Sequence, residues 1–363
     1  MTPPPIPFLR LSGTYREVGA AIGEAWRSTI TAACDPAGWT TPSGRTAKEQ
    51  LDLADRYAEP TRAAMPWIFD ELEGCADGAS VDPRALWACC IEEIWYAPRV
   101  PGRTGAAIAG RCTDLVAVPP ATVDDHVLTA HNNDMSRRYQ DDLVAIERTC
   151  GDDPAVFTIG NGIWISTGWN GAGMNLTGNE LSPNDERIGI PREIQVRAML
   201  RERTLEGMVA VALHPGRASS YNNVLVAADG RVANVEGSAT DAEIRGADER
   251  GHLVHTNHYV CDAMRRYEGD HEYAVLSARR YARAAALLDA APEGTVTVET
   301  LHGFLQDHTG APDSLCRHEA PDRTSVTAFW CVADLTDRVI HYGRSNPCDS
   351  AHQEFRFADA TAA

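Results

Sequence analysis

The spacing of apolar residues along the chain changes near residue 110. Within TYREVGAAIGEAW, apolar side chains recur every four residues and form one stripe of a helix, at Val18, Ile22 and Trp26. The stretches 47–74 and 83–96 continue in the same helical style, and no alternating run precedes residue 110. The pattern therefore predicts that residues 1–111 form a helical segment.

Beyond residue 110, short β-rich segments separated by turn residues predict strands. They include TDLVAV, HVLTAH, AVFTIG and IWIST. Asp229-Gly230 lies between two alternating runs and predicts a hairpin, and TAFWCVADLTDRVIHYG predicts another near the end of the chain. Helices are expected at 191–214, at 277–290 and after Thr297, a candidate N-cap.

This order of elements favours an α+β fold, in which antiparallel sheets carry helices on their outer faces. The change of pattern near residue 110 is the internal boundary that we predict. It separates a helical N-terminal segment, residues 1–111, from a β-rich part, residues 112–363.

The composition is that of a globular protein and excludes two classes of function. Of 363 residues, 44% are hydrophobic and 23% are charged, the balance that a packed core with a polar surface needs. The net charge is −18 and no run of Lys or Arg exceeds two residues, so the chain lacks the basic face of a nucleic-acid binder. No run of 18 apolar residues and no signal-peptide pattern occur, so we expect a cytoplasmic protein without a membrane partner.

One of the ten cysteines stands out as a candidate nucleophile. No CxxC pair occurs, so we expect free thiols that pack as small apolar side chains, and no structural zinc cluster. The motifs GxSxG, GxxxxGK[ST] and HExxH are absent from the sequence as well. Cys112, in AGRCTDLVAV, lies where the helical segment meets the first predicted strand.

The position of Cys112 suggests a way to activate its thiol. If the preceding peptide bond is cut, Cys112 becomes a chain terminus and its own α-amine can serve as the base. A thiol has a reference pKa of about 8.5 and is mostly protonated at neutral pH, whereas an α-amine has a pKa of about 7.7–8.0. A buried cysteine that only packs is the alternative interpretation.

The chain resembles the acyl-CoA:isopenicillin N acyltransferase family of N-terminal-nucleophile (Ntn) hydrolases. The motifs that carry the resemblance span most of the chain: YREVGAAIGEAW, ELEGCADGASVDP, RCTDLVAV, HNNDM, GWNGAGMNLTGNEL, VEGS, HTNHY, DHTGAPDSLCRH and GRSNPC. The resemblance implies a four-layer αββα fold with two stacked antiparallel sheets, covered by the segment 1–111. It also implies that cleavage leaves a small chain, 1–111, and a catalytic chain, 112–363, which remain associated as a heterodimer.

The resemblance also assigns roles to individual residues. It implies that Cys112 is the nucleophile, that Arg111-Cys112 is the self-cleavage point and that Asp134 orients the α-amine. Asn257 matches the family's oxyanion donor, and Arg323 matches its active-site arginine. Two further positions align without a defined role, Asn179 in TGNEL and Ser238 in VEGS.

These assignments have structural alternatives. Asp134 is also suited to cap a turn, Asn257 to bind backbone groups at a strand end, and Arg323 to pair with its neighbour at the surface. Many relatives have glycine before the nucleophile. The side chain of Arg111 at this position favours slow cleavage unless Gly110 supplies the flexibility.

The implied activity is acyl transfer through a thioester on Cys112. The substrate is expected to be an N-acyl amide or an acyl thioester, with water or an amine as acceptor, and no cofactor or metal is required. A coenzyme A thioester is a candidate donor because arginines could hold its phosphates. Three adjacent pairs are candidates, with ordinary surface pairs as the alternative: Arg137-Arg138, Arg265-Arg266 and Arg279-Arg280.

Two other functions remain open from the sequence. His252, His255 and His258 could build a metal-dependent hydrolase, although the β-like LVHTNHY pattern sends His252 and His255 to opposite faces. The second is an unprocessed binding protein that keeps the fold without catalysis, for which Arg111 is the sequence support.

Overall fold

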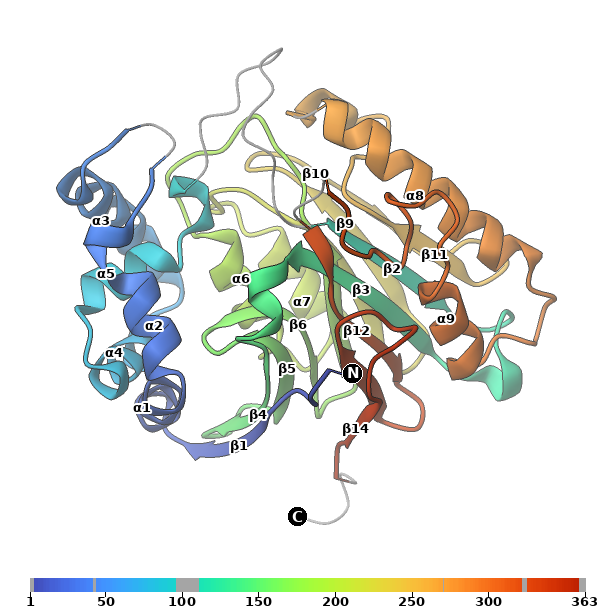
Figure 1. Ribbon diagram of the computed structural model, residues 1–363, viewed down its shortest axis with the longest axis horizontal. Helices are drawn as coiled ribbons and strands as arrows, with labels where there is room; N and C mark the ends of the chain where they lie inside the picture. The colour runs from blue at the N-terminus through green and yellow to red at the C-terminus, as the bar shows by residue number, and fades with distance from the viewer. Residues whose placement is uncertain (1–2, 42–43, 96–110, 270, 322–324, 359–363) are drawn as a thin grey trace.

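Two stacked sheets with helices on both outer faces form the core of the chain (Figure 1). The computed structural model describes residues 3–41, 44–95, 111–269, 271–321 and 325–358. Apolar side chains of both sheets, among them Phe157, Trp169 and Phe329, fill the space between them. The four-layer αββα fold is therefore confirmed.

The larger sheet has eight strands in the order β1-β4-β5-β6-β7-β8-β9-β10. Its strands are β1 (Phe8–Gly13), β4 (Val144–Cys150), β5 (Val156–Asn161), β6 (Trp164–Asn170), β7 (Met174–Asn179), β8 (Asn222–Ala227), β9 (Val232–Gly237) and β10 (Ala242–Arg245). All neighbours in this sheet are antiparallel except β1 and β4, which are parallel.

The smaller sheet is antiparallel throughout, in the order β11-β2-β3-β12-β13-β14. Its strands are β2 (Arg111–Ala117), β3 (Leu128–Ser136), β11 (His252–His255), β12 (Ser325–Asp334), β13 (Val339–Arg344) and β14 (Gln353–Arg356). The predicted hairpins are confirmed as β8–β9 and β12–β13, and Gly230 adopts the positive φ of 88° that the first turn requires.

Nine named helices cover the two sheets in the described part of the chain. They are α1 (Tyr15–Ala25), α2 (Arg27–Cys34), α3 (Ala47–Ala64), α4 (Trp67–Ala79), α5 (Pro83–Cys89), α6 (Arg192–Met199), α7 (Leu205–Ala212), α8 (His271–Ala290) and α9 (Val298–Leu305). The helices α6 and α7 pack on the larger sheet, and α8 and α9 pack on the smaller one. Thr297 caps α9 as predicted, and none of the described helices is long and apolar enough to cross a bilayer.

The segment before residue 96 is mainly helical but also contains a strand, which the sequence pattern did not predict. The strand β1 is six residues long and lies at the edge of the larger sheet, paired with β4. Its partner lies more than 130 residues away, so no local turn signal marks the pairing. The prediction that this segment is purely helical is therefore wrong at 8–13.

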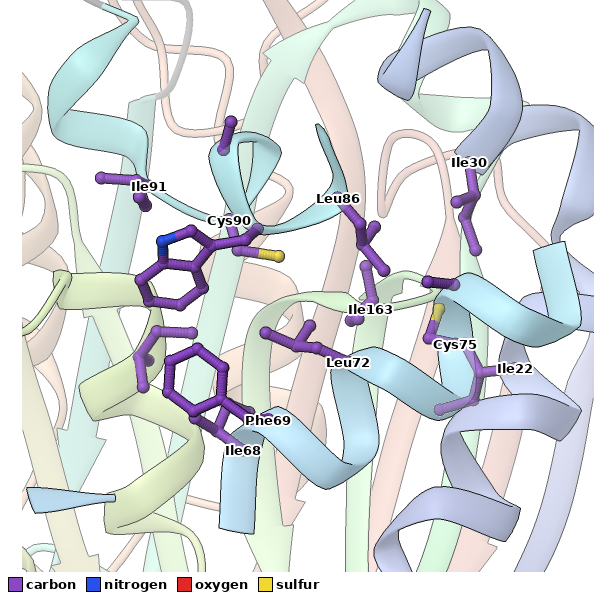
Figure 2. Close-up of a cluster of buried hydrophobic side chains, with 14 of the residues drawn as sticks. Ile22, Ile30, Ile68, Phe69, Leu72, Cys75, Leu86, Cys90, Ile91 and Ile163 are labelled. Atoms are coloured by element: carbon purple, nitrogen blue, oxygen red, sulfur yellow. The ribbon is translucent and has the colours of Figure 1, made fainter. Parts of the chain in front are cut away.

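The helices α1 and α4 pack unusually closely because glycines face each other between them. Each helix carries a pair four residues apart, Gly19 and Gly23 on α1, and Gly74 and Gly78 on α4. A Cβ added at Gly78 would lie 2.1 Å from the carbonyl oxygen of Ala20. Figure 2 shows the apolar cluster around this helix pair, in which Ile22, Leu72 and Cys75 lie beside Leu86 of α5 and Ile163.

We expect Gly78→Ala to lower the free energy of unfolding by about 1–3 kcal/mol, because the new methyl group forces the two helices apart. The matched control is Gly303→Ala in α9, where an added Cβ meets no atom within 4 Å. Alanine there should leave stability unchanged or raise it by up to about 1 kcal/mol. Urea unfolding followed by circular dichroism measures both, and equal effects would contradict the close packing of α1 and α4.

Candidate active site

Cys112 is the second residue of β2, between β11 and β3 in the smaller sheet, and its thiol is buried. Side chains alternate along a strand, so Cys112 and Asp114 share one face of β2. Across the ladder, Cys112 pairs with Asn133 and Asp114 pairs with His131. These four side chains therefore lie together on the face that looks toward the larger sheet.

A histidine and a carboxylate lie beside the thiol. His131 Nδ1 is 2.9 Å from Asp114 Oδ1. Burial lowers the pKa of His131, but the adjacent Asp114 carboxylate outweighs it and raises this pKa to about 10. Burial raises the pKa of the Cys112 thiol, and its hydrogen bond with His131 opposes that shift. At neutral pH the site thus holds an imidazolium next to a sulfur atom, which favours the thiolate.

Asn133 completes this face of the site. Its Nδ2 atom lies 3.8 Å from Cys112 Sγ and 3.3 Å from His131 Nε2. Its Oδ1 atom is buried and has no hydrogen-bond partner among the described residues. A buried polar atom without a partner is costly, so this amide is suited to bind a substrate group beside the sulfur.

Asn257 binds the backbone of the candidate nucleophile. The Cys112 N–H donates to Asn257 Oδ1 at 2.7 Å, and Arg280 Nη2 donates to the same oxygen at 2.7 Å. Both partners can only donate, so the oxygen must face them, and Asn257 Nδ2 donates instead to the carbonyl of Glu180 at 3.1 Å. In the intact chain Asn257 therefore touches Cys112 as expected, but with its oxygen rather than with the NH₂ group that an oxyanion needs.

Asp134 lies next to the scissile bond on the other face of β3. Its backbone pairs with Arg111, and Thr327 Oγ1 donates to its Oδ1 at 2.7 Å. The guanidinium Nε of Arg317 is 3.7 Å from Asp134 Oδ2. Burial raises the pKa of Asp134, and the charges of Arg317 and Arg280 oppose this shift. A carboxylate at this place is suited to bind an α-amine on residue 112.

Two buried arginines line the site, and the sequence interpretation missed both. Arg280, on α8, is 1% exposed, so the interpretation of Arg279-Arg280 as a surface pair is wrong for this member. Arg317 is fully buried within DHTGAPDSLCRH, a motif that carried the resemblance, and it pairs with Asp313 at 2.7 Å. Arg323, expected to be the active-site arginine, lies outside the described residues. Position within the quoted motif was the one signal for Arg317.

The other two arginine pairs lie on the surface and have acidic or aromatic neighbours. Arg137 is 3.2 Å from Glu319, and Arg138 lies over the ring of Tyr139. Arg265 and Arg266 pair with Asp262 and Asp241, at 3.1 and 2.5 Å. This arrangement fits ordinary surface pairs better than a phosphate site.

Asn179 belongs to a neighbouring polar cluster between the sheets. Its Oδ1 atom is 2.9 Å from His255 Nδ1, and His255 Nε2 is 2.9 Å from Glu236 Oε1. Burial raises the pKa of Glu236, but the hydrogen bond with His255 and backbone N–H donors outweigh it and lower this pKa to about 2. Because His255 pairs with Asp114 across β11 and β2, the cluster supports the strand that carries Cys112.

Ser238 lies in the turn after β9. Its hydroxyl donates to Asp185 at 2.9 Å and accepts from the backbone N–H groups of Thr240 and Asp241. In the described residues these bonds serve the turn and connect Ser238 to no member of the Cys112 group.

The three histidines of the alternative metal site do not converge. His255 faces the larger sheet, His258 Nδ1 lies 2.9 Å from Ser277 Oγ, and His252 lies 4.0 Å from Asp289 on α8. In the parts of the chain that the structure describes, none of them belongs to a group of three or more ligand atoms within 4.8 Å. The expected opposite orientation of His252 and His255 explains this outcome.

We expect acid to destabilise the protein partly through Glu236. Its folded pKa of about 2 lies below the ordinary value of 4.5, so its contribution is present above pH 4.5 and is lost as pH falls toward 2. Glu236→Gln should remove roughly 2–3 kcal/mol of this pH dependence. Urea unfolding at pH 5.5 to 3 tests it, with the exposed Glu243→Gln on β10 as control. Identical pH slopes for wild type and Glu236→Gln would contradict this role.

Comparison with known proteins identifies the family. The sequence model of the acyl-coenzyme A:6-aminopenicillanic acid acyl-transferase family matches residues 121–347. Similar solved structures include a mutant of the conjugated bile acid hydrolase from Clostridium perfringens, with 13% identity, a TM-score of 0.45 and coverage of 68% of this chain and 97% of that one. Penicillin V acylase from Agrobacterium tumefaciens has 16% identity, a TM-score of 0.44 and coverage of 64% and 83%. The chain belongs to the acyl-coenzyme A:6-aminopenicillanic acid acyl-transferase family and is an enzyme of the Ntn-hydrolase type, an acyltransferase or an amide hydrolase.

Proposed function

We propose that the chain cleaves itself at Arg111-Cys112 and then transfers acyl groups through a thioester on Cys112. The observation that carries this proposal is the placement of the Cys112 thiol and of its own backbone N–H. The thiol lies beside His131 and Asn133, while the N–H is held by Asn257. One residue thus presents both the nucleophile and the peptide nitrogen that leaves.

In the cleavage step the Cys112 thiolate attacks the carbonyl carbon of Arg111. The bond from this carbon to the Cys112 nitrogen breaks as the bond to sulfur forms, and the nitrogen takes up a proton and becomes the α-amine. His131 stabilises the thiolate and is the proton source within the site. Water then hydrolyses the thioester and releases the new carboxylate of Arg111 and the free thiol of Cys112.

In the mature enzyme the same thiol attacks the acyl donor. The α-amine of Cys112 accepts the thiol proton, with Asp134 and the Asn257 oxygen as the groups that orient it. The NH₂ group of Asn133, 3.8 Å from the sulfur, and that of Asn257 after rearrangement are the candidates to stabilise the oxyanion. No step in this scheme needs a redox cofactor.

The family name supports an acyl-CoA thioester as donor and an amine as acceptor, whereas amide hydrolysis uses water for the second step. Both reactions pass through the same acyl-enzyme, and the exclusion of water from the thioester decides between them. We therefore propose small N-acyl amides and acyl thioesters as the substrate class.

The two chains are expected to stay together after cleavage, as units 1–111 and 112–363. The strand β1 is hydrogen-bonded into the larger sheet beside β4. Buried Glu71 of α4 pairs with Arg148 at 3.2 Å and with Arg197 of α6, and Glu93 accepts from the backbone N–H of Arg192 at 2.9 Å. Separating the chains would strand these charges without partners, which is strongly unfavourable.

We expect denaturing mass spectrometry of the purified protein to show two chains, 1–111 and 112–363. Cys112→Ala should remain a single chain and should not turn over N-acyl amides or acyl thioesters, because it lacks the nucleophile for both steps. Cys261→Ser, which removes a thiol outside the site, should cleave like the wild type. An intact, inactive wild-type chain would favour the non-catalytic binding protein, and an active Cys112→Ala would refute the mechanism.

His131→Gln should slow the cleavage by about 10²-fold or more, because the imidazolium no longer stabilises the thiolate. The rate is read from the masses present at intervals after synthesis of the chain. The control is His126→Gln, since His126 also pairs with a carboxylate, Asp334 at 2.6 Å, but lies at the opposite end of β3. Unchanged cleavage in both variants would show that His131 has no part in this step.

A further inference from the structure

Four metal-binding side chains converge away from Cys112. They are His308, Cys316, His318 and Cys348, and one ligand atom from each lies within 4.8 Å of all the others. Cys316 is buried, whereas the other three are exposed. We propose that these two cysteines and two histidines bind a zinc ion.

The distances between the ligand atoms fit a tetrahedral zinc site. The two sulfur atoms are 3.6 Å apart, and His318 Nε2 lies 3.7 Å from Cys316 Sγ and 3.4 Å from Cys348 Sγ. The Nε2 atoms of His308 and His318 are 3.0 Å apart. A tetrahedron with Zn–S of about 2.3 Å and Zn–N of about 2.0–2.1 Å separates its ligand atoms by roughly 3.3–3.8 Å. A disulfide would need the sulfur atoms at about 2.05 Å.

The chemistry of the four groups selects zinc over the hard cations. Thiolate and imidazole ligands suit Zn²⁺, whereas Mg²⁺ and Ca²⁺ require oxygen ligands. Each thiol gives up its proton on binding, so two thiolates balance the charge of the ion. Asn346 Nδ2 lies 3.4 Å from Cys316 Sγ and donates to the carbonyl of Arg317 at 2.8 Å, which supports the thiolate from outside the ligand set. Four protein ligands leave no open position, as in structural zinc sites.

The ion would join two segments that are distant in sequence. His308, Cys316 and His318 belong to the connection between α9 and β12, and Cys348 follows β13. The two cysteines are 32 residues apart, so no CxxC spacing reveals them, and the expectation of no metal rested on that spacing. The site replaces that expectation with a clip between the connection and the turn after β13.

This clip would also position an active-site residue. Arg317 lies between the ligands Cys316 and His318, and its guanidinium faces Asp134 at 3.7 Å. Its backbone is bound to β12, because Thr327 Oγ1 accepts from the Arg317 N–H at 2.9 Å. Zinc on both sides of Arg317 would fix the depth at which this arginine enters the site. Arg317 is thus a positioning residue that acts through Asp134.

The test is the metal content of the full-length protein, measured by elemental analysis after exhaustive dialysis against metal-free buffer. We expect one zinc per chain, and less than about one tenth of this in Cys348→Ser and His308→Gln, which lose one of four ligands. Cys261→Ser should keep the zinc, and so should Cys112→Ala, which separates this result from the fate of the cleavage reaction. Cobalt added to the chelated wild type should give the intense visible absorption of a tetrahedral thiolate site.

Loss of zinc should also lower the midpoint of thermal unfolding of the wild type while leaving that of Cys348→Ser unchanged on chelation. Three results would overturn the proposal. The first is a wild-type chain that holds no zinc after supplementation, and the second is a disulfide between Cys316 and Cys348. The third is a cobalt spectrum that survives Cys348→Ser unaltered.

Discussion

The hydrogen bond from the Cys112 N–H to the Asn257 side chain is the constraint around which the site is arranged. It fixes the start of β2 against the segment that follows β11, so the thiol must point toward the larger sheet. Arg280 donates to the same oxygen from α8 and prevents the amide from turning. A helix on one outer face thus determines which group of Asn257 meets the candidate scissile bond.

The position of β2 in the smaller sheet explains why polar groups can gather there without loss of the fold. Farther along the strand, Leu115, Val116 and Ala117 are buried in the two apolar layers on either side of the sheet. Only the first residues of β2 face histidines, amides and carboxylates. Several of these buried polar atoms, such as Asn133 Oδ1 and Asp134 Oδ2, have no hydrogen-bond partner in the described residues. The packing of the apolar end of the strand therefore holds these costly polar groups in place.

The sequence predicts those features whose cause is local. Asp229-Gly230 specifies its hairpin and Thr297 its helix, because a turn and a cap depend on a few adjacent residues. The resemblance led to Cys112 and to the residue that contacts it. The role of His131 and the burial of Arg280 could not be predicted, since both follow from strand register and helix packing across distant parts of the chain.

The connection between α9 and β12 poses a separate physical problem. It must bury the guanidinium of Arg317 completely, although no helix or strand holds its described residues. Ordering such a connection costs backbone entropy, and a charged side chain in the interior adds the cost of desolvation. Hydrogen bonds to Asp313 and β12 offset part of this cost. A cross-link through His308, Cys316, His318 and Cys348 would lower the entropy of the unfolded connection, as a metal does when it closes a long loop. The same four ligands then account both for the order of this connection and for the precise approach of Arg317 to Asp134.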